Sequence, residues 1–329
     1  MAKTLYYRVG NLDNGKVVWT PDNSRSYDTG RSPSCSLNDE GVIAEVHQTH
    51  RDDSDKMYYH LGKLDGDQIA WAKTGGTNYD KGKCPSVSLN NSNVLVEVHQ
   101  SPKSSYLDGG YSNAKSYRLF SRVGIIVNNA IEWNPDKATQ FKDKSERPSI
   151  SINNNNDLII VEQKTRKYGS RNNTYWGHDG LKSQQGKVED CKLFQQSTSV
   201  TFSSATDNTW PEVAVNDHGE VLAVFSKAGS DKLYYRTGKT SSNKLRINWN
   251  KEVINYTKGS HPSVSINNNG EVVEVHQASS GSKLWCKVGV LVDGKVTWDE
   301  GGSVNYTTGK SPSVSINNKN QVIEVHEQA

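Results

Sequence analysis

Apolar residues are scarce in this chain: they make up 33% of its 329 residues, charged residues make up 23%, and the mean hydropathy is −0.76. A chain this polar cannot fill one deep core, but it can fill thin apolar layers between small stacked sheets. No apolar run reaches the length of a membrane span, and no signal peptide precedes the first strand-like segment at Leu5. We therefore expect a soluble protein that is cytoplasmic, exported without a classical signal, or a mature form.

Cysteine is also scarce, and the four residues lie far apart without a C-x-x-C spacing: Cys35, Cys84, Cys191 and Cys286. Cys35 takes a position held by Val or Ile in related segments and Cys286 takes a Tyr position, so we expect both to be small buried hydrophobic residues. We predict no disulfide framework, no metal site and no cofactor. The net charge of +3 is close to balance and predicts neither nucleic acid nor an anionic membrane as a partner.

What the chain does contain is a repeated hairpin, seen most clearly in the segment 261–277, HPSVSINNNGEVVEVHQ. Two runs with period-2 alternation flank an Asn-Asn-Asn-Gly segment, which predicts two strands joined by a tight turn. Close copies occur at Pro33–Gln48, Pro85–Gln100 and Pro312–Glu327, and weaker ones at Pro148–Gln163 and Pro211–Ser226.

The spacing of the recurring proline indicates the fold. It stands at positions 33, 85, 148, 211, 262 and 312, so each step is between 50 and 63 residues. Four strand-like segments in a repeat of about 50 residues are typical of a β-propeller blade. The step from Pro312 through the C-terminus and on from Met1 to Pro33 is again 50 residues. We therefore predict an all-β fold, a six-bladed β-propeller of four-stranded blades, closed by pairing the N-terminal and C-terminal strands.

The chain is expected to form one domain, 1–329. The predicted blades are 33–71, 85–133, 148–190, 211–249, 262–298, and 312–327 together with 5–19. The small Pro-Ser-Val-Ser strand suits the crowded inner position around the axis, and the strand ending in Trp suits the outer rim. Two insertions, 101–115 and 164–196, lengthen the longest steps and are expected on the surface.

Four polar or aromatic positions recur and form the candidate ligand-binding set. They are the Glu of E-V-H (Glu45, Glu97, Glu274, Glu324), the His two residues on (His47, His99, His276, His326), a cation on the next strand (Arg8, His60, Arg122, Lys287) and the outer Trp (Trp19, Trp71, Trp133, Trp298). Glu and His two residues apart in a strand point to the same face. Two blades replace the pair together, with Ile160 and Glu162 or with Ala223 and Phe225, which indicates that the pair works as a unit.

Two interpretations of this unit remain open. Propeller sheets are covered on both faces by their neighbours, so an in-strand Glu is often part of a satisfied buried network. Alternatively, each set forms a carbohydrate pocket between blades, because sugars need an aromatic surface and charge-assisted hydrogen-bonding groups. Repetition of a weak site around a ring would then add avidity.

With its length, its repeats of about fifty residues and its Arg/Glu/Trp set in each complete repeat, the chain resembles six-bladed lectin propellers such as the fungal fucose-binding type. The resemblance covers the whole chain and is architectural, without a diagnostic lectin motif. It implies a non-catalytic protein whose partners are glycans or glycoconjugates, bound at repeated sites between blades.

Two other functions are kept as alternatives. The insertions 101–115 and 164–196 would serve a protein-binding scaffold or toxin-associated module with a protein partner. The segment 36–41, SLNDEG, is similar to the Asp-box turn of sialidases but lacks its Thr-Trp, which makes a sialidase-like, glycan-active enzyme the third possibility. Catalysis requires one asymmetric constellation, whereas these polar residues are repeated, so we expect that the protein is not an enzyme.

Overall fold

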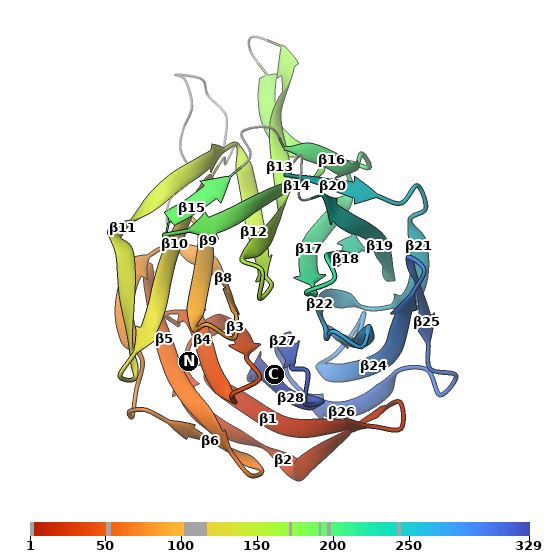
Figure 1. Cartoon of the computed structure of the whole chain (residues 1–329). Coiled ribbons are helices and arrows are strands. Elements are labelled where there is room, and N and C mark those ends of the chain that lie inside the picture. The colour runs from red at the N-terminus through yellow and green to blue at the C-terminus, as the bar shows by residue number, and fades with distance from the viewer. Residues whose placement is uncertain are drawn as a thin grey trace.

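The computed structural model describes residues 3–50, 54–101, 117–170, 173–190, 192–195, 199–241 and 245–329. Six antiparallel sheets of four or five strands are arranged in a ring around a central axis (Figure 1). The predicted six-bladed β-propeller is therefore confirmed. Within the described ranges, no helix is long and apolar enough to cross a membrane.

Each blade is one sheet, numbered I to VI here. Blade I contains β3 (Arg31–Leu37), β4 (Val42–Gln48), β5 (Lys56–Asp65), β6 (Gln68–Trp71) and β7 (Thr77–Lys81). Blade II contains β8 (Lys83–Leu89), β9 (Val94–Gln100), β10 (Arg118–Val127) and β11 (Ala130–Asp143). Blade III contains β12 (Ser145–Ile152), β13 (Asp157–Ser170), β14 (Asn173–Glu189), β15 (Lys192–Gln195) and β16 (Val200–Ser203).

The remaining blades repeat this order. Blade IV contains β17 (Asn208–Val215), β18 (Glu220–Lys227), β19 (Lys232–Ser241), β20 (Arg246–Trp249) and β21 (Ile254–Lys258). Blade V contains β22 (Ser260–Ile266), β23 (Glu271–Gln277), β24 (Lys283–Val292), β25 (Lys295–Trp298) and β26 (Val304–Thr308). Blade VI contains β27 (Lys310–Ile316), β28 (Gln321–Glu327), β1 (Thr4–Asp13) and β2 (Lys16–Thr29).

Blade VI closes the ring with strands from the two ends of the chain. β1 pairs with β28 over seven residues, from Leu5 opposite Glu327 to Asn11 opposite Gln321. This is the predicted closure. The Pro-Ser-Val-Ser strand lies at the inner edge of its sheet and next to the inner strands of the neighbouring blades, as expected.

The inner strands are sheet edges, and serine hydroxyls satisfy part of their backbone. The N–H of Leu89 in β8 donates to Ser36 Oγ in β3 at 2.9 Å, and the N–H of Leu37 donates to Ser315 Oγ in β27 at 3.0 Å. The same bond recurs at other junctions. A small residue with a hydroxyl therefore suits this position, because it fits the crowded axis and accepts a bond that no neighbouring strand supplies.

The asparagine-rich turns form a second ring at one end of the axis. In each turn the first Asn side chain closes the hairpin: Asn38 Oδ1 accepts the N–H groups of Glu40 and Val42 at 3.1 and 2.9 Å. The next residue links neighbouring blades, because its backbone N–H donates to the corresponding side-chain oxygen of the following blade at 2.7–2.9 Å. The six residues of this closed ring are Asp39, Asn91, Asn154, Asp217, Asn268 and Asn318.

The apolar core is divided into layers between neighbouring blades. Each of the six hydrophobic clusters joins residues of two adjacent sheets, as when Val9 of blade VI packs with Ile43 and Ile69 of blade I. Cys35 and Cys286 belong to such layers and are 5% and 6% exposed, as predicted for small buried residues. The polar composition is therefore compatible with a stable fold, because each apolar layer has to fill only the space between two adjacent sheets.

One insertion lies partly within the described residues. The segment 164–196 lengthens β13 and β14, which pair out to Ser170 opposite Asn173 in a hairpin that projects from the ring (Figure 1). The insertion 101–115 lies outside the described residues except for Ser101.

The inner-strand serines provide a test of the fold. We expect Ser36→Ala to lower the free energy of unfolding by about 1–3 kcal/mol, because the buried N–H of Leu89 loses its acceptor. Urea denaturation measures the change, with Ser92→Ala at an exposed turn position as the matched control. Equal stability of the two variants would contradict this role for the hydroxyl.

Candidate functional site

The residue before each inner-strand proline has a left-handed backbone. In all six blades φ lies between 48° and 51° at this position, occupied by Ser32, Cys84, Arg147, Trp210, His261 and Ser311. Such a φ is uncommon for residues other than glycine, and a following proline restricts the backbone further. A register shift at the same place marks a β-bulge in each inner strand. Bulges and strained backbone are over-represented next to functional sites.

The last residue of the E-V-H-Q strand supports this strained position in the next blade. Gln48 Oε1 accepts the backbone N–H of Cys84, and Gln100 Oε1 accepts that of Arg147, both at 3.0 Å. Glu327 Oε1 accepts the N–H of Ser32 at 2.7 Å. Gln48 and Gln100 are therefore structural residues.

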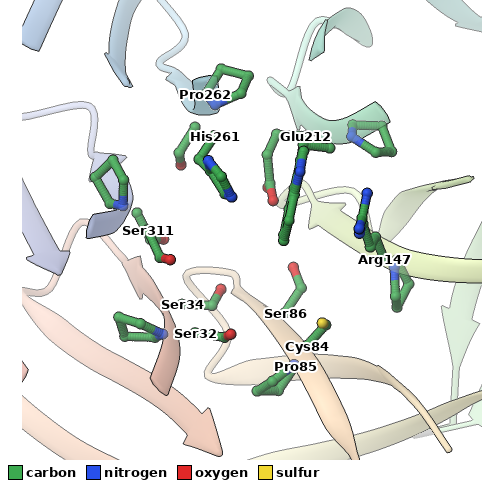
Figure 2. A pocket seen from close by; sticks show the side chains of 17 residues that line it. Ser32, Ser34, Cys84, Pro85, Ser86, Arg147, Glu212, His261, Pro262 and Ser311 are labelled. Carbon is green, nitrogen blue, oxygen red and sulfur yellow. The ribbon is translucent and has the colours of Figure 1, made fainter. Parts of the chain in front are cut away.

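The six bulges surround a pocket at one mouth of the axis, with a cavity volume of about 80 Å³ (Figure 2). That is several times the roughly 10–15 Å³ needed for one water. Although the fold repeats, the side chains at the bulges do not. The pocket is thus an asymmetric constellation, in contrast to the repeated Glu and His positions.

Arg147, Trp210 and His261 form a stack on one side of this pocket. The guanidinium carbon of Arg147 lies 4.0 Å from the centre of the Trp210 ring, and the His261 ring centre lies 4.1 Å from it. Burial and the charge of Arg147 lower the pKa of His261 to about 4, so its ring is neutral at pH 7. Its Nδ1 is buried and has no hydrogen-bond partner among the described residues.

Glu212 is the one carboxylate among the described residues that line the pocket. It stands where other inner strands have Ser34 or Ser86, and its Oε2 accepts a hydrogen bond from Ser149 Oγ at 2.8 Å. Burial raises the pKa of Glu212 to about 7, and the bond from Ser149 only partly opposes that. The pocket therefore combines a fixed cation, an aromatic ring, a neutral imidazole and a carboxyl group that is half-protonated near neutrality.

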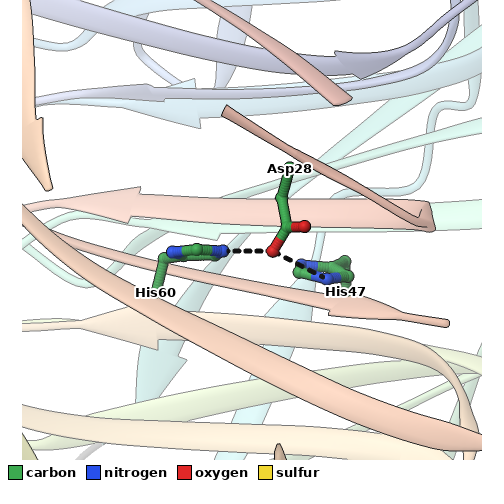
Figure 3. Close-up of side chains that lie close together, drawn as sticks. All are labelled: Asp28, His47 and His60. Atoms are coloured by element: carbon green, nitrogen blue, oxygen red, sulfur yellow. Dashed lines mark hydrogen bonds and ion pairs between the residues drawn. The ribbon is translucent and has the colours of Figure 1, made fainter. Parts of the chain in front are cut away.

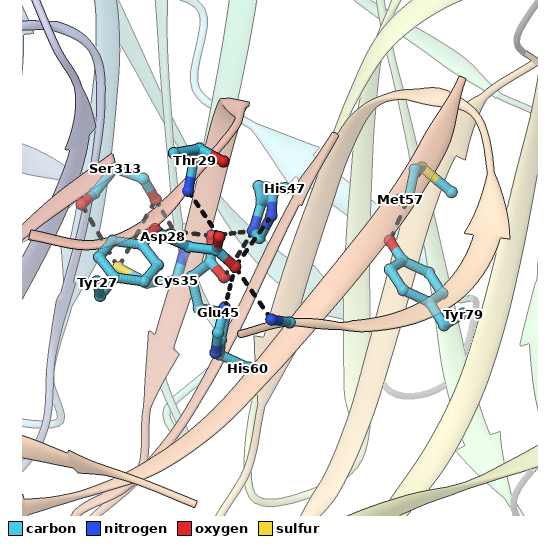
Figure 4. Close-up of polar contacts among 11 residues, drawn as sticks. Tyr27, Asp28, Thr29, Cys35, Glu45, His47, Met57, His60, Tyr79 and Ser313 are labelled. Carbon is cyan, nitrogen blue, oxygen red and sulfur yellow. Dashed lines mark hydrogen bonds and ion pairs between the residues drawn. The ribbon is translucent and has the colours of Figure 1, made fainter. Parts of the chain in front are cut away.

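The predicted Glu and His positions lie between blades, buried beneath the surface. The four Glu side chains are fully buried, and the four His residues are 1–2% exposed. At the junction of blades VI and I, Tyr27 donates its hydroxyl to Glu45 Oε1 at 2.9 Å, and Glu45 Oε2 lies 3.1 Å from His47 Nδ1. The Tyr–Glu bond recurs with the same length for Glu97, Glu274 and Glu324. His60, the predicted cation of blade I, contacts Asp28 beside His47 (Figures 3 and 4).

The tyrosine of this unit was missed by the sequence analysis, although it stands in every well-preserved connector. Its role is visible where it changes. At the same bulged position, Phe141 packs in the cluster with Ile160, and Phe202 packs in the cluster with Ala223. The hydroxyl is therefore lost wherever the carboxylate is lost, which is what a buried hydrogen-bonded pair requires.

The predicted cations are buried and the predicted tryptophans are half-buried, and together they form an outer layer beside this unit. Arg122 lies 4.5 Å from the Trp133 ring centre and donates to the carbonyl oxygen of Tyr79 at 2.6 Å. Lys287 lies 5.7 Å from the Trp298 ring, and Trp71 stacks on Tyr27 at 5.0 Å.

One inter-blade cleft brings two predicted site residues to a sizeable cavity. Between blades V and VI, Arg8 and Trp19 line a cavity of about 380 Å³ with Asp299 and Asn305. Arg8 lies 5.6 Å from the centre of the Trp19 ring. Val18 and Val304 at this cleft are 52% and 56% exposed, so its rim is apolar.

Comparisons with known proteins place the fold. No family model and no curated protein matches the chain. A Hadza microbial sialidase has a TM-score of 0.56 and 9% identity over 95% of this chain and 71% of that one. The alpha-L-arabinanase of Penicillium chrysogenum has a TM-score of 0.56 and 11% identity, over 100% of this chain and 98% of that one. The alpha-L-arabinofuranosidase of Fusarium graminearum has a TM-score of 0.53 and 12% identity, over 99% of this chain and 97% of that one. At such identities the likeness shows a shared propeller fold, and these three neighbours are glycan-acting proteins.

The buried unit is tested by giving one junction the residues found at another. Glu97→Ala leaves the Tyr79 hydroxyl and His99 without their acceptor, and we expect a loss of about 3–5 kcal/mol in unfolding free energy. Adding Tyr79→Phe and His99→Phe recreates the Phe202, Ala223 and Phe225 set found between blades III and IV, and should recover part of that loss. Strictly additive losses in urea denaturation would show that the three side chains do not form a unit.

Glu212 predicts a pH dependence of stability. The folded chain holds the Glu212 proton up to about pH 7, whereas the unfolded chain releases it above its ordinary value of 4.5. Its contribution is therefore fully present below pH 4.5 and is lost as the pH rises to about 7. We expect Glu212→Gln to gain stability relative to the unchanged chain across that window, measured by urea denaturation. The exposed Glu40→Gln is the control, and a constant difference over the window would refute the assignment.

Proposed function

We propose that the protein is a non-catalytic carbohydrate-binding propeller that holds a glycan in clefts between blades, best formed between blades V and VI. The observation that supports this proposal is the cavity of about 380 Å³ beside Arg8 and Trp19, since ligand pockets usually enclose about 300–1,000 Å³.

The chemistry of this cleft suits a sugar. Exposed Val18 and Val304 offer an apolar surface to the C–H face of a pyranose ring, together with the edge of half-buried Trp19. Asp299 and the Oδ1 atom of Asn305 supply acceptors for hydroxyl groups, while the Asn305 amide N–H groups donate to the carbonyl oxygens of Leu284 and Thr307. The buried Glu324 and His326 beneath would then act through the residues above them, holding Tyr306 and the wall of the cleft in place.

The cleft differs from its counterparts at the other junctions. The residue before the outer tryptophan is Val18 here, but Ala70, Glu132 and Thr297 elsewhere. We expect repeated clefts of unequal affinity, with the V–VI cleft the strongest.

The glycan-active enzyme is the second candidate, favoured by the names of the structural neighbours. Glycoside hydrolysis in its usual form requires two carboxyl groups across the bond that is cleaved. Glu212 is the one carboxyl group among the described residues that line the axial pocket. This pocket therefore supports binding of a small polar group better than hydrolysis.

A glycan array followed by calorimetry with the best ligand tests the proposal. We expect Val18→Glu, which copies Glu132 of blade II, to weaken binding about tenfold or more, equivalent to about 1.4 kcal/mol. Val292→Glu is the matched control, because Val292 is 55% exposed on β24 but does not line the cleft.

Three other outcomes would reject this assignment. Binding that survives Val18→Glu but is lost in Glu212→Gln would move the site to the axial pocket. Release of free sugar from the ligand would make the protein an enzyme. Absence of binding to any glycan would favour the protein-binding scaffold.

A further inference from the structure

Three potential metal ligands converge at the junction of blades VI and I. Asp28 comes from β2, His47 from β4 and His60 from β5. Asp28 Oδ2 lies 2.6 Å from His60 Nε2 and 3.8 Å from His47 Nε2, and the three ligand atoms all lie within 4.8 Å of one another (Figure 3). It is the one group of this kind found in the part of the chain that the structure describes.

The surroundings orient His47 and Asp28 as a metal site requires. Glu45 lies 3.1 Å from His47 Nδ1, which leaves His47 Nε2 directed at Asp28. A carboxylate on the far ring nitrogen is the usual partner of a metal-binding histidine, because it fixes the tautomer and the ring orientation. The backbone N–H of Gly76 donates to Asp28 Oδ2 at 3.0 Å and holds the third ligand.

Space for an ion is kept by a glycine and by an adjoining cavity. A Cβ at position 76 would lie 3.3 Å from both Asp28 Oδ2 and His60 Nε2, and 2.9 Å from Tyr58 Cβ. The cavity of about 330 Å³ beside the site is lined by Asp28, His47 and Gly76 and by Thr49 and Lys56. A fourth coordination position therefore faces an open cavity.

The distances are close to those of a tetrahedral site. Ligands about 2.0–2.1 Å from Zn²⁺ lie about 3.3 Å from one another. The observed separations of 2.6 and 3.8 Å from Asp28 Oδ2 lie on either side of that value. The two histidine nitrogens lie within 4.8 Å of each other, so side-chain adjustments would bring all three atoms to an ion.

Among the three ligand positions, one residue differs between this junction and its sister between blades I and II. There the corresponding residues are Asp80, His99 and Arg122, and Arg122 lies 3.5 Å from Asp80. A guanidinium cannot bind a cation, whereas the imidazole of His60 can.

We propose that Asp28, His47 and His60 bind a divalent transition-metal ion of the Zn²⁺ class. Two imidazoles and one carboxylate bind ions of this class in preference to Ca²⁺ or Mg²⁺. The ion bridges blade VI, where the chain ends pair, and blade I. Because it binds the folded chain, it also stabilises the closed ring.

Calorimetry with Zn²⁺ alone, on the full chain freed of metal by a chelator, tests the proposal. We expect one Zn²⁺ per chain and a rise in Tm on binding. His60→Arg should abolish both effects while the chain remains folded, because it copies the Arg122 arrangement of the next junction. Arg122→His should do the reverse and add a second site, with Asp80 and His99 as the other ligands.

Co²⁺ provides an independent reading, since a tetrahedral site with nitrogen ligands gives a visible absorption band that His60→Arg should remove. His218→Gln, at an exposed histidine, is the control and should leave both measurements unchanged. No Zn²⁺ binding by the unchanged chain, or equal binding by His60→Arg, would overturn the proposal. Circular dichroism of each variant separates loss of the site from loss of the fold.

Discussion

Every blade presents an unpaired strand edge to the axis, and the structure depends on satisfying that edge without another strand. Ser36 and Ser315 show how this is done: a hydroxyl of one blade accepts the N–H of the next. Asn91 and Asp39 do the same in the turns at one end of the axis. Because each bond joins neighbouring blades, the ring is held by polar contacts near its axis and by apolar layers further out.

These contacts between blades also indicate which residues are available for function. Residues that recur from blade to blade hold neighbouring blades together, as Glu45 does with Tyr27 and His47. Residues that depart from the repeat bring different chemistry to the same positions. Glu212 replaces an inner serine and lies in the axial pocket, and His60 replaces a cation and meets Asp28. In a repeat protein, exceptions to the pattern therefore carry more functional information than the pattern itself.

The proposed binding clefts follow from this division. The buried Glu and His hold the tyrosines that form the walls between blades, while the outer residues decide what a cleft can accept. Val18 and Glu132 occupy equivalent places with opposite chemistry, so identical backbones yield clefts of different character. Such a fold is therefore suited to a multivalent binder with unequal sites.

The sequence by itself determined the architecture: the proline spacing predicted six blades, and the matching of the end segments predicted that β1 would pair with β28. Period-2 alternation and turn residues are local signals, and closure needs only a count of repeats. Only the tertiary structure decided how residues from different blades meet. Tyr27 and Glu45 stand 18 residues apart, a spacing that recurs at the other three junctions, but they belong to different blades. Asp28 and His60 also belong to different blades and stand 32 residues apart. Their contact depends on how neighbouring sheets stack, and no periodicity within one strand records that stacking.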